Sequence, residues 1–512
     1  MIEKIVIANR GEIAVRIIRS CREMGVRSVA LFSEADRMSK HVMLADEAYP
    51  IGPAPSKESY LDVDKIIETA LKCGADAVHP GYGFLSENAG FARKCEVAGI
   101  TFIGPRAETI ERMGDKISAR RSMTEAGVPV VPGIQRQLES ATEAERICRE
   151  IGLPVILKAA SGGGGKGMRL IRSESEIGEA YAAAKSEALS SFGDETVYIE
   201  KYIEEPHHIE FQILGDAHGN IVHLYDRECS VQRRHQKIVE ESPSPFLTDE
   251  LRQEMGKTAA AAARAVGYVG AGTIEFLVDK NRNFYFLEMN TRLQVEHPVT
   301  EEVLGLDLVK EQIYIASGRP LHLRQTDIVQ RGHSIECRIC AEDADNGFMP
   351  SPGLVKQVTE PNGLGIRIDS YIYEGYEIPV YYDPMISKLI VRATTREYAV
   401  QRMRAALDEY KVTGIKTNIS YLNAIMHTPD FVRGGYDTAF LEKNEKIIHR
   451  YLREPFPAGA DDRLVEDLVL IAAQINYLVM QQEGGGSSPA AADTGTLNRW
   501  REFGKRKGVM RI

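Results

Sequence analysis

Five polar side chains stand at every second position in the segment EMNTRLQVEHPVTE, which begins at residue 288. Residues two apart in a strand project to the same face, so one face here would carry only charged and amide groups. Met289, Leu293 and Val295 would take the other face. The pattern is typical of a solvated edge strand or of a strand that presents a polar site. The five side chains are Glu288, Asn290, Arg292, Gln294 and Glu296.

A hairpin immediately upstream favours the polar site. The runs TIEFLVD and FYFLEMN are rich in aromatic and β-branched residues and flank the four-residue connection 280–283. We expect this connection to set a register in which Asp279 pairs with Phe284. The same register makes Glu275 and Glu288 directly opposed partners.

Opposed carboxylates predict a metal site. Like charges on facing strands destabilise a sheet, and a hard divalent cation between Glu275 and Glu288 would remove that penalty. Asn290 supplies a further oxygen on the same face. Mg²⁺ usually keeps few protein ligands and completes its shell with water and substrate phosphates, so we expect a phosphate site elsewhere in the chain.

The glycine-rich segment SGGGGKGM is the candidate phosphate site. Gly162, Gly164 and Gly167 have the GxGxxG spacing, but a strand follows them, and Lys166 is not followed by the Ser or Thr of a Walker A motif. One interpretation is a glycine hairpin over nucleotide phosphates, with Lys158 on the preceding strand. The other is a flexible surface loop. Close approach of backbone to a ligand would explain the chain entropy that consecutive glycines cost.

A second basic segment, SVQRRHQK, is interpreted as one strand. Arg233, His235 and Lys237 would then share a face, with Gln232 on the opposite face. A solvated basic strand is the ordinary explanation, but a cationic face aimed at a transferring phosphoryl group agrees better with the metal pair and the glycine loop. Lys116, at a predicted helix start in MGDKISAR, is a weaker candidate.

The composition is that of a globular protein with several domains. The chain has 512 residues, enough for three or four domain-sized units. Its net charge of −10 gives no electrostatic footprint for nucleic acid. The start MIEKIVIANRGE puts charges where a secretory signal needs apolar residues, and no run of about 18 apolar residues occurs. We therefore expect a cytoplasmic protein that binds neither nucleic acid nor membrane.

The seven cysteines are scattered along the chain. Only Cys337 and Cys340 form a CxxC pair, with no second pair or histidine cluster nearby in the sequence. Neither a zinc site nor a disulfide framework is expected.

Alternating strands and helices must position these side chains. KIVIAN reads as a strand, a helical pattern of isoleucines runs to Gly25, and VRSVALFS follows, which together predict a βαβ unit. The turn NRGEIA lacks GxGxxG spacing, so we interpret this part as a substrate-side or structural domain. HPGYGFLSEN, residues 79–88, follows a predicted strand and is either a simple turn or part of a ligand crevice.

The remaining chain predicts a mixed α/β part up to about Arg331, then a unit rich in short strands. Residues 461–482 show an amphipathic helical pattern. GGGSSPAAADTG is a flexible linker by composition, and LNRWREFGKRKGVMRI is a basic tail that carries the only tryptophan.

Seven motifs, taken in this order, resemble the biotin carboxylase component of biotin-dependent carboxylases, an ATP-grasp enzyme. They are ANRGEIAVR, HPGYGFLSEN, MGDK, KAASGGGGKGM, RECSVQRRHQK, GAGTIEF and FLEMNTRLQVEHPVTE. The resemblance implies an α/β and α+β multidomain fold in which ATP phosphorylates bicarbonate to carboxyphosphate, whose CO₂ carboxylates N1′ of carrier-bound biotin. The implied parts are a Rossmann-like N-terminal domain at 1–113, an ATP-grasp domain at 114–330 with a mobile lid at about 130–203, a C-terminal biotin carboxylase domain at 331–446, and a helical extension, linker and basic tail at 447–512.

The resemblance also implies roles for single residues. Bicarbonate would contact Arg292, Gln294 and the Val295 backbone, Glu296 would be the catalytic base, and Arg338 would bind the biotin enolate. Arg292, Glu296, Arg338 and Lys237 form the implied catalytic set. Glu275, Glu288 and Asn290 would hold Mg²⁺ or Mn²⁺, and the chain is expected to bend after Asn290 so that both halves of the segment converge. The implied ATP contacts are Lys116, Lys158, Gly164, Gly165, Glu200, Lys201, Tyr202, Ile203, His208, Gln232, His235, Lys237, Glu275 and Glu288.

The partners follow from what the chain lacks. No lysine lies between methionines, as biotin attachment in this family requires. We therefore expect a biotin carboxyl carrier protein and a carboxyltransferase to act in trans as separate subunits, with the chain itself a homodimer. The parent enzyme would be an acyl-CoA (acetyl-CoA) carboxylase or, alternatively, a two-subunit pyruvate (2-oxo acid) carboxylase. An ATP-grasp ligase that joins an acyl phosphate to an amine is disfavoured by RLQVEHP and Arg338, and a non-catalytic regulatory role by the retention of every presumed catalytic group.

Overall fold

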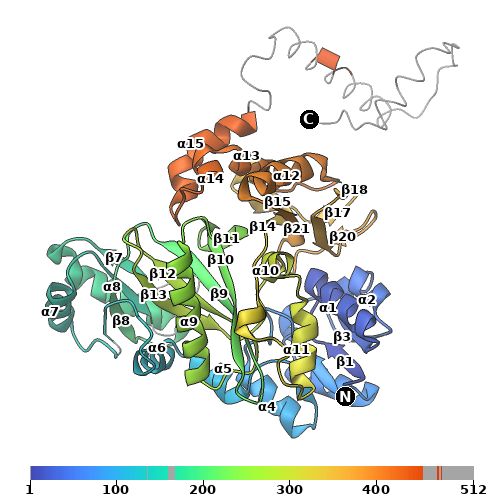
Figure 1. The fold of residues 1–512 in the computed structure, drawn as a ribbon, viewed down its shortest axis with the longest axis horizontal. Coiled ribbons are helices and arrows are strands. Elements are labelled where there is room, and N and C mark those ends of the chain that lie inside the picture. Colours follow the sequence, from blue (N-terminus) through green and yellow to red (C-terminus); the bar gives the residue numbers. More distant parts are fainter. Residues whose placement is uncertain (1, 135, 160–167, 454–469, 472–473, 475–512) are drawn as a thin grey trace, which may run out of the picture. The chain divides into compact units, whose positions relative to one another are not determined.

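The computed structural model describes residues 2–134, 136–159, 168–453, 470, 471 and 474 (Figure 1). It divides into two compact units, Met1–His449 and Arg450–Ile512. Gly164 and Gly165 of the glycine-rich segment lie outside the described residues. The same holds for the predicted linker, the basic tail and all but three residues of the predicted helix at 461–482.

A five-stranded parallel sheet with its helices forms the N-terminal part, as the strand–helix–strand pattern predicts. Its elements are β1 Lys4–Ile7, α1 Gly11–Met24, β2 Arg27–Ser33, α2 Lys40–Leu44, β3 Glu47–Gly52, α3 Val63–Cys73, β4 Ala77–His79, α4 Ala89–Val97, β5 Thr101–Phe102 and α5 Ala107–Gly114. The strand order is β3-β2-β1-β4-β5. Gly25 ends α1 in the left-handed conformation, at φ 70°, which glycine adopts without strain.

A separate three-stranded antiparallel sheet with two helices has its own apolar core. Its elements are α7 Ala141–Ile151, β6 Val155–Ala159, β7 Arg169–Ile171, α8 Ile177–Phe192 and β8 Val197–Lys201. The core includes Ile147, Leu157, Tyr181 and Ile199. This part coincides with the segment expected to form the lid.

One antiparallel sheet of eight strands carries most of the polar residues singled out above. In spatial order its strands are β13 Phe284–Asn290, β12 Gly270–Val278, β9 His207–Gly215, β10 Ile221–Arg233, β11 Gln236–Ser242, β14 His333–Cys340, β21 Met385–Ala393 and β19 Ile366–Ser370. A domain boundary was predicted between residues 330 and 331, with β11 before it and β14 after it. These two strands pair, with Glu240 opposite Glu336, so a single sheet contains strands from both sides of the predicted boundary. Side chains from both sides of that boundary therefore lie on neighbouring strands.

Helices and short strands complete this unit. They are α6 Lys116–Glu125, α9 Asp249–Ala265, α10 His297–Leu304, α11 Leu308–Ala316, β15 Glu342–Asp343, β16 Met349–Pro350, β17 Gly353–Leu354, β18 Gln357–Thr359, β20 Glu377–Ile378, α12 Arg396–Glu409, β22 Lys411–Thr413, α13 Ile419–His427, α14 Pro429–Arg433 and α15 Phe440–Arg453.

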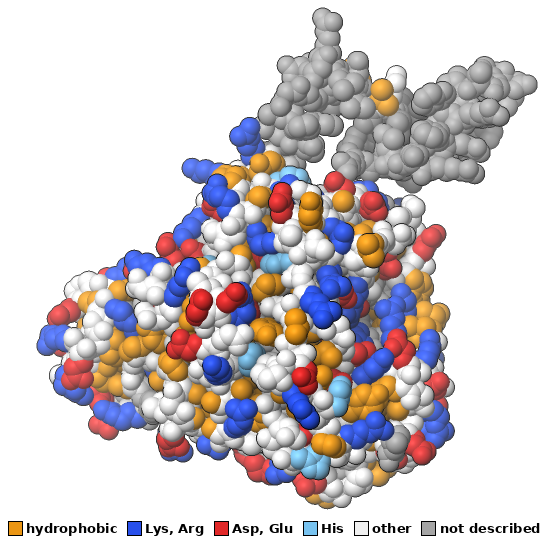
Figure 2. Space-filling view, in the orientation of Figure 1, with side chains coloured by type: hydrophobic (Ala, Val, Ile, Leu, Met, Phe, Trp, Pro, Cys, Tyr) orange, Lys and Arg blue, Asp and Glu red, His pale blue; other side chains and the backbone are white. Residues whose placement is uncertain are grey.

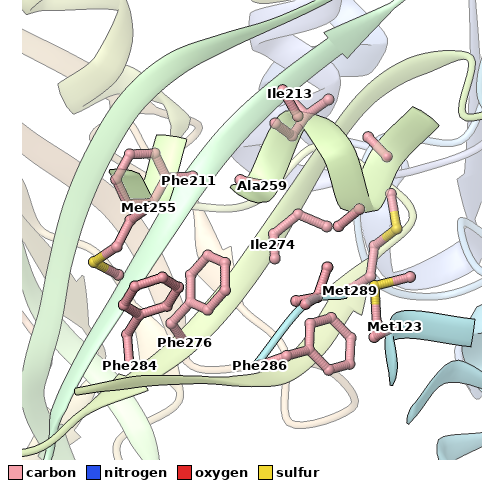
Figure 3. Packing of buried hydrophobic residues seen from close by; sticks show 14 of the residues in the cluster. Met123, Phe211, Ile213, Met255, Ala259, Ile274, Phe276, Phe284, Phe286 and Met289 are labelled. Atoms are coloured by element: carbon pink, nitrogen blue, oxygen red, sulfur yellow. The ribbon is translucent and has the colours of Figure 1, made fainter. Parts of the chain in front are cut away.

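A buried apolar cluster fixes the hairpin that carries the opposed carboxylates. Met255 and Ala259 of α9 belong to one buried cluster with Phe211 of β9 and with Ile274 and Phe276 of β12 (Figure 3). Ile274 and Phe276 flank Glu275 in the sequence, so burying them on one face of the sheet turns Glu275 to the other face. Burial of these large side chains thus stabilises the orientation of a polar residue.

Charged side chains of both signs are interspersed over the molecular face drawn in Figure 2. Among the residues that the structure describes, no helix combines the length and the apolar character needed to cross a membrane.

Candidate active site

The hairpin of β12 and β13 sets Glu275 directly opposite Glu288, as predicted. The register near the loop differs from the prediction, because Val278 rather than Asp279 pairs with Phe284. A bulge between the pairs of Glu275 and Phe276 corrects the difference, since it adds one unpaired residue to β13. The predicted start of the register was wrong, and the predicted carboxylate pair is confirmed.

The two opposed carboxylates have different environments. Glu275 is buried, and although burial alone would raise its pKa, the charges of Lys237 and His208 hold the pKa of Glu275 well below its usual range. Desolvation and the neighbouring Glu275 carboxylate raise the pKa of Glu288. A divalent cation would relieve this repulsion, so the donor set fits Mg²⁺ or Mn²⁺. The Asn290 amide donates to Glu275 Oε1 at 2.8 Å, which brings the third predicted ligand beside the pair.

Lys237 lies among three carboxylates. Its Nζ donates to Glu210 Oε2 at 2.6 Å, Glu275 Oε1 at 2.9 Å and Glu296 Oε1 at 2.7 Å. Burial opposes a charge here, but the three carboxylates outweigh it and raise the pKa of Lys237 well above its ordinary value. The ammonium is thus permanently charged, and His208 Nε2 lies 2.8 Å from Glu275 Oε2 on the same side.

The chain bends after Asn290, as expected. The strand ends there, and Gln294 turns back to donate to Glu275 Oε1 at 2.7 Å. Glu296 immediately precedes α10, where its carboxylate is buried. The predicted single strand face therefore ends at Asn290, and a turn brings Gln294 back to the buried carboxylate of Glu275.

Arg338 joins the C-terminal part to this turn. Its Nε donates to Glu240 Oε1 at 2.6 Å and its Nη2 to Glu296 Oε2 at 2.9 Å. Glu296 is thus clamped between two cations, Lys237 and Arg338. Burial alone would raise the pKa of Glu296, yet these cations and Arg227 hold that pKa well below its usual range.

The other residues expected to contact bicarbonate lie on the same turn. Arg292 donates from Nη2 to Asn290 Oδ1 at 3.0 Å. The carbonyl of Val295 accepts from the buried Nζ of Lys388 at 2.8 Å, which fixes that peptide.

Two buried residues of the site, Arg227 and Glu210, were not predicted from the sequence. Arg227 is fully buried and donates to Glu210 Oε1 at 2.5 Å and to Gln294 Oε1 at 2.8 Å. Glu210 also holds Lys237. A signal for Glu210 was present, because His208, Glu210 and Gln212 alternate with Ile209, Phe211 and Ile213 along β9.

The segment SVQRRHQK is a hairpin rather than one strand, which corrects the prediction. Arg234 and His235 form the turn between β10 and β11, at φ 50° and 66°, so both take the positive φ of a two-residue type I′ turn. Arg233 points to Glu342, at 2.9 Å, instead of sharing a cationic face with Lys237. Gln232 donates to His208 Nδ1 at 2.8 Å, which places it beside the carboxylate pair.

A pocket adjoins Glu288 of the opposed carboxylates. Lys116, Lys158, Tyr198, Glu200 and Glu288 are among the residues that line it. Lys158 donates to Glu200 Oε2 at 2.6 Å, and burial together with the charges of two neighbouring basic side chains lowers the pKa of Lys158 to about 8. The pocket therefore brings two lysines predicted to bind phosphate to one end of the metal pair.

Not all of the other residues implied as ATP contacts face this pocket. Lys201 donates to the carbonyls of Gly152 and Leu153, each at 2.9 Å, so its ammonium is engaged away from the pocket. Tyr202 and Ile203 are half-buried just after β8. His235 is exposed in the β10–β11 turn.

Comparison with protein families covers nearly all of the first unit. Residues 1–110 match the model described as biotin carboxylase, N-terminal domain, and residues 336–443 match the biotin carboxylase C-terminal domain. Residues 115–324 match the ATP-binding domain of the carbamoyl-phosphate synthase L chain.

Individual relatives agree with these matches. A pyruvate carboxylase subunit of Methanothermobacter thermautotrophicus is 53% identical over 469 residues, which are 91% of this chain and 95% of that protein. Biotin carboxylase 1 of Bacillus subtilis is 54% identical over 443 residues, 86% of this chain and 98% of that one. The biotin carboxylase domain dimer of Hydrogenobacter thermophilus 2-oxoglutarate carboxylase, solved with MgADP, ADP and bicarbonate, is 51% identical with a TM-score of 0.83, over 88% of this chain and 99% of that one.

Proposed function

The chain belongs to the biotin carboxylase family of ATP-dependent ligases, and on this premise we propose that it carboxylates biotin on a separate carrier protein. ATP and bicarbonate react first: a bicarbonate oxygen attacks the γ-phosphorus, ADP leaves and carboxyphosphate forms. Carboxyphosphate then breaks into CO₂ and phosphate. CO₂ bonds to N1′ of biotin, and the released phosphate accepts the N1′ proton.

The observation that carries this proposal is the chain of ion pairs Lys237–Glu296–Arg338. Lys237 lies beside Glu275 of the metal pair, whereas Arg338 belongs to β14 of the C-terminal part. A ligase that joins an acyl phosphate to an amine would not need a guanidinium at the Arg338 end of this series of ion pairs. Biotin carboxylation requires one, because negative charge develops on the ureido oxygen when N1′ loses its proton.

We assign the first step to residues of the turn after β13. Arg292 and Gln294 would bind bicarbonate, with the Val295 backbone, and Glu296 would accept the bicarbonate proton. Lys237, Arg338 and Arg227 depress the pKa of Glu296. Anionic substrates that contact Lys237 and Arg338 offset those charges and raise the basicity of Glu296 when it is needed.

The nucleotide would occupy the pocket lined by Lys116, Lys158 and Glu200. Lys237 is placed to stabilise charge on the transferring phosphoryl group. Mg²⁺ or Mn²⁺ held by Glu275, Glu288 and Asn290 would neutralise phosphate charge and orient the γ-phosphate for attack. Lys158 and Lys116 would bind phosphate oxygens on the Glu288 side of the pair Glu275 and Glu288.

A direct test measures ATP hydrolysis by the purified chain. We expect hydrolysis to require bicarbonate and Mg²⁺ and to rise when free biotin is added. The matched control is Arg338→Lys, which keeps the positive charge but removes the planar fork. This variant should retain bicarbonate-dependent hydrolysis and lose the stimulation by biotin. Hydrolysis that ignores bicarbonate in the unsubstituted chain would contradict the proposal.

The parent enzyme is proposed to be an acyl-CoA carboxylase, with carrier and carboxyltransferase as separate subunits. A two-subunit pyruvate or other 2-oxo acid carboxylase is the second candidate, favoured by one observation. The similarity to the pyruvate carboxylase relative extends over 469 residues, against 443 for the Bacillus subtilis biotin carboxylase, and so covers more of this chain. Copurification from the host, with identification of the bound transferase, distinguishes the two.

We also propose a homodimer, by analogy with the dimer of the Hydrogenobacter thermophilus domain. The exposed side chain of Leu364, of which 90% is accessible, would be covered in a second copy. Light scattering of the chain and of Leu364→Glu tests this assignment, with a loss of dimer expected in the variant. Unchanged dimer in Leu364→Glu would place the interface elsewhere.

A further inference from the structure

Glu87, at the end of HPGYGFLSEN, contacts the arginine to which we assign bicarbonate binding. Its Oε2 accepts from Nε of Arg292 at 2.8 Å, and its Oε1 accepts from the backbone N–H of Thr291 at 3.0 Å. One carboxylate from the N-terminal part therefore holds both the guanidinium and the peptide that precedes it.

Hydrogen bonds hold the backbone on both sides of Glu87. The next residue, Asn88, caps α4 by accepting from the N–H of Phe91 at 2.8 Å. Earlier in the same segment, the Asn9 amide donates to the carbonyls of Pro80 and Tyr82, each at 2.7 Å. These bonds join ANRGEIAVR to HPGYGFLSEN and fix the backbone of the segment that carries Glu87.

The loop leaves little room to move near Asn9. Gly81 has φ 62°, and a Cβ built there would lie 3.0 Å from Asn9 Nδ2 and 3.0 Å from Ile13. A side chain at residue 81 would therefore be both strained and crowded. The segment is thus packed as a support rather than as a free surface turn.

The hydrogen bonds of Arg292 show which of its N–H groups remain to bind an anion. A guanidinium has five N–H groups, and Nε, Nη1 and Nη2 each donate once, to Glu87, the Leu293 carbonyl and Asn290 respectively. Among the described residues, this leaves one N–H on each terminal nitrogen without an acceptor. Two N–H groups on neighbouring nitrogens are the donors that bind a planar oxyanion in bidentate fashion.

We propose that Glu87 is a positioning residue for bicarbonate, which fixes the Arg292 guanidinium so that its two remaining N–H groups face the anion. The inference rests on the proposed function, since it needs Arg292 to bind bicarbonate. The contact joins residues 205 positions apart, and it assigns to HPGYGFLSEN a role that the reaction scheme leaves open. Glu87 acts through Arg292 and does not touch the reacting atoms.

The test is steady-state kinetics of Glu87→Gln across a bicarbonate titration. Glutamine keeps the shape but cannot accept from both Arg292 and Thr291 as a carboxylate does. We expect the KM for bicarbonate to rise about 10-fold or more, since a hydrogen bond to a charged group is lost, with the KM for ATP and the Tm unchanged. The matched control is Glu111→Gln, which removes an exposed ion pair with Arg93 in the same part of the chain and should behave as the unsubstituted protein.

A second measurement separates positioning from a general structural effect. In an Arg292→Ala background, Glu87→Gln should cause no further rise in the KM for bicarbonate, because there is no guanidinium left to position. An equal rise in both backgrounds, or a parallel rise in the KM for ATP, would overturn the inference. So would an active Glu87→Gln variant with an unchanged KM for bicarbonate. If the unsubstituted chain showed no bicarbonate-dependent hydrolysis, the proposed function would fail first and this inference with it.

Discussion

At the scale of single residues, the site is a set of carboxylates whose ionisation is controlled by a few buried cations. Lys237 alone contacts Glu210, Glu275 and Glu296. Each of these carboxylates would be costly to bury as an isolated charge, and the shared ammonium offsets that cost. Glu288 has no such partner among the ion pairs of the described residues, and desolvation together with the neighbouring Glu275 carboxylate raises the pKa of Glu288.

Glu288→Gln tests the metal pair. We expect the variant to fold normally, because Glu288 is exposed at the pocket, and to lose metal-dependent turnover, because the opposed Glu275 keeps only half of the anionic site. The measurement is ATP hydrolysis over an Mg²⁺ titration, with exposed Glu254→Gln as the control. Near-normal activity at ordinary Mg²⁺ would count against the pair as the metal site.

Glu296→Gln tests the base. The variant keeps the shape of the side chain and removes its basicity, so turnover should fall by roughly 10²-fold or more while the KM for ATP stays nearly constant. Arg292→Ala should instead raise the bicarbonate requirement as well as slow the reaction. Both variants are compared over a bicarbonate titration. Full rescue of Glu296→Gln by high bicarbonate would show that Glu296 only positions the substrate.

At the scale of elements, one continuous sheet brings the two chemical steps together. Lys237, which we propose to stabilise the transferring phosphoryl group, is on β11, and Arg338, which we propose to bind the biotin enolate, is on the paired strand β14. Lys388 on β21 then supports the turn through the Val295 carbonyl. The turn is therefore held by three strands as well as by Glu87 from outside the sheet.

Element packing also predicts a pH dependence of stability. His41 in α2 is buried, accepts from Ser39 or donates to it through Nδ1 at 2.9 Å, and contacts the Leu31 carbonyl through Nε2 at 3.1 Å. Burial lowers the pKa of His41 from 6.5 to about 4, with Asp36 opposing and Arg10 reinforcing the shift. Between pH 6.5 and 4 the unfolded state binds more protons than the folded state, so stability is lost as the pH falls through that window.

His41→Gln checks this effect by removing the titrating group. Chemical denaturation at pH 7 and pH 5 gives the drop in the free energy of unfolding for each protein. We expect the drop to be about 2 kcal/mol larger for the unsubstituted chain than for the variant. Equal drops would mean that folding does not shift the pKa of His41.

At the scale of the whole molecule, the family similarity and the first compact unit end close together. The C-terminal family model stops at residue 443, the first unit ends at His449, and α15 ends at Arg453. All residues assigned to the reaction precede this point. The chain after it therefore lies outside the part to which catalysis is assigned.

A chain ending at Arg453 tests this division. We expect bicarbonate-dependent, biotin-stimulated ATP hydrolysis to remain within about twofold of the full chain, because no proposed site residue is removed. Binding to carrier or transferase subunits should weaken, as measured by copurification with the natural partners. An insoluble or inactive truncated chain would instead make residues 454–512 part of the catalytic core.

The sequence by itself determined the features that depend on local spacing. Alternation of polar and apolar residues predicted the hairpin and the shared face of its polar side chains, since residues two apart share a strand face. The opposition of Glu275 and Glu288 also depends on the bulge in β13, which the spacing does not record. Helical spacing likewise located α1, Gly11–Met24. The bend after Asn290 could be expected because both halves of its polar segment had to converge.

Only the tertiary structure decided which distant groups complete the site. Arg227, Lys388 and Glu87 reach the turn from three separate segments, and no local periodicity records those contacts. The turn at Arg234 and His235 could not be predicted either. It has only two residues and lies within a run of polar residues whose spacing is equally typical of one continuous strand. Spacing along the chain fixes the face on which a side chain lies, whereas its partner depends on which strands pair and which loops pack beside them, and that is settled only when the whole core forms.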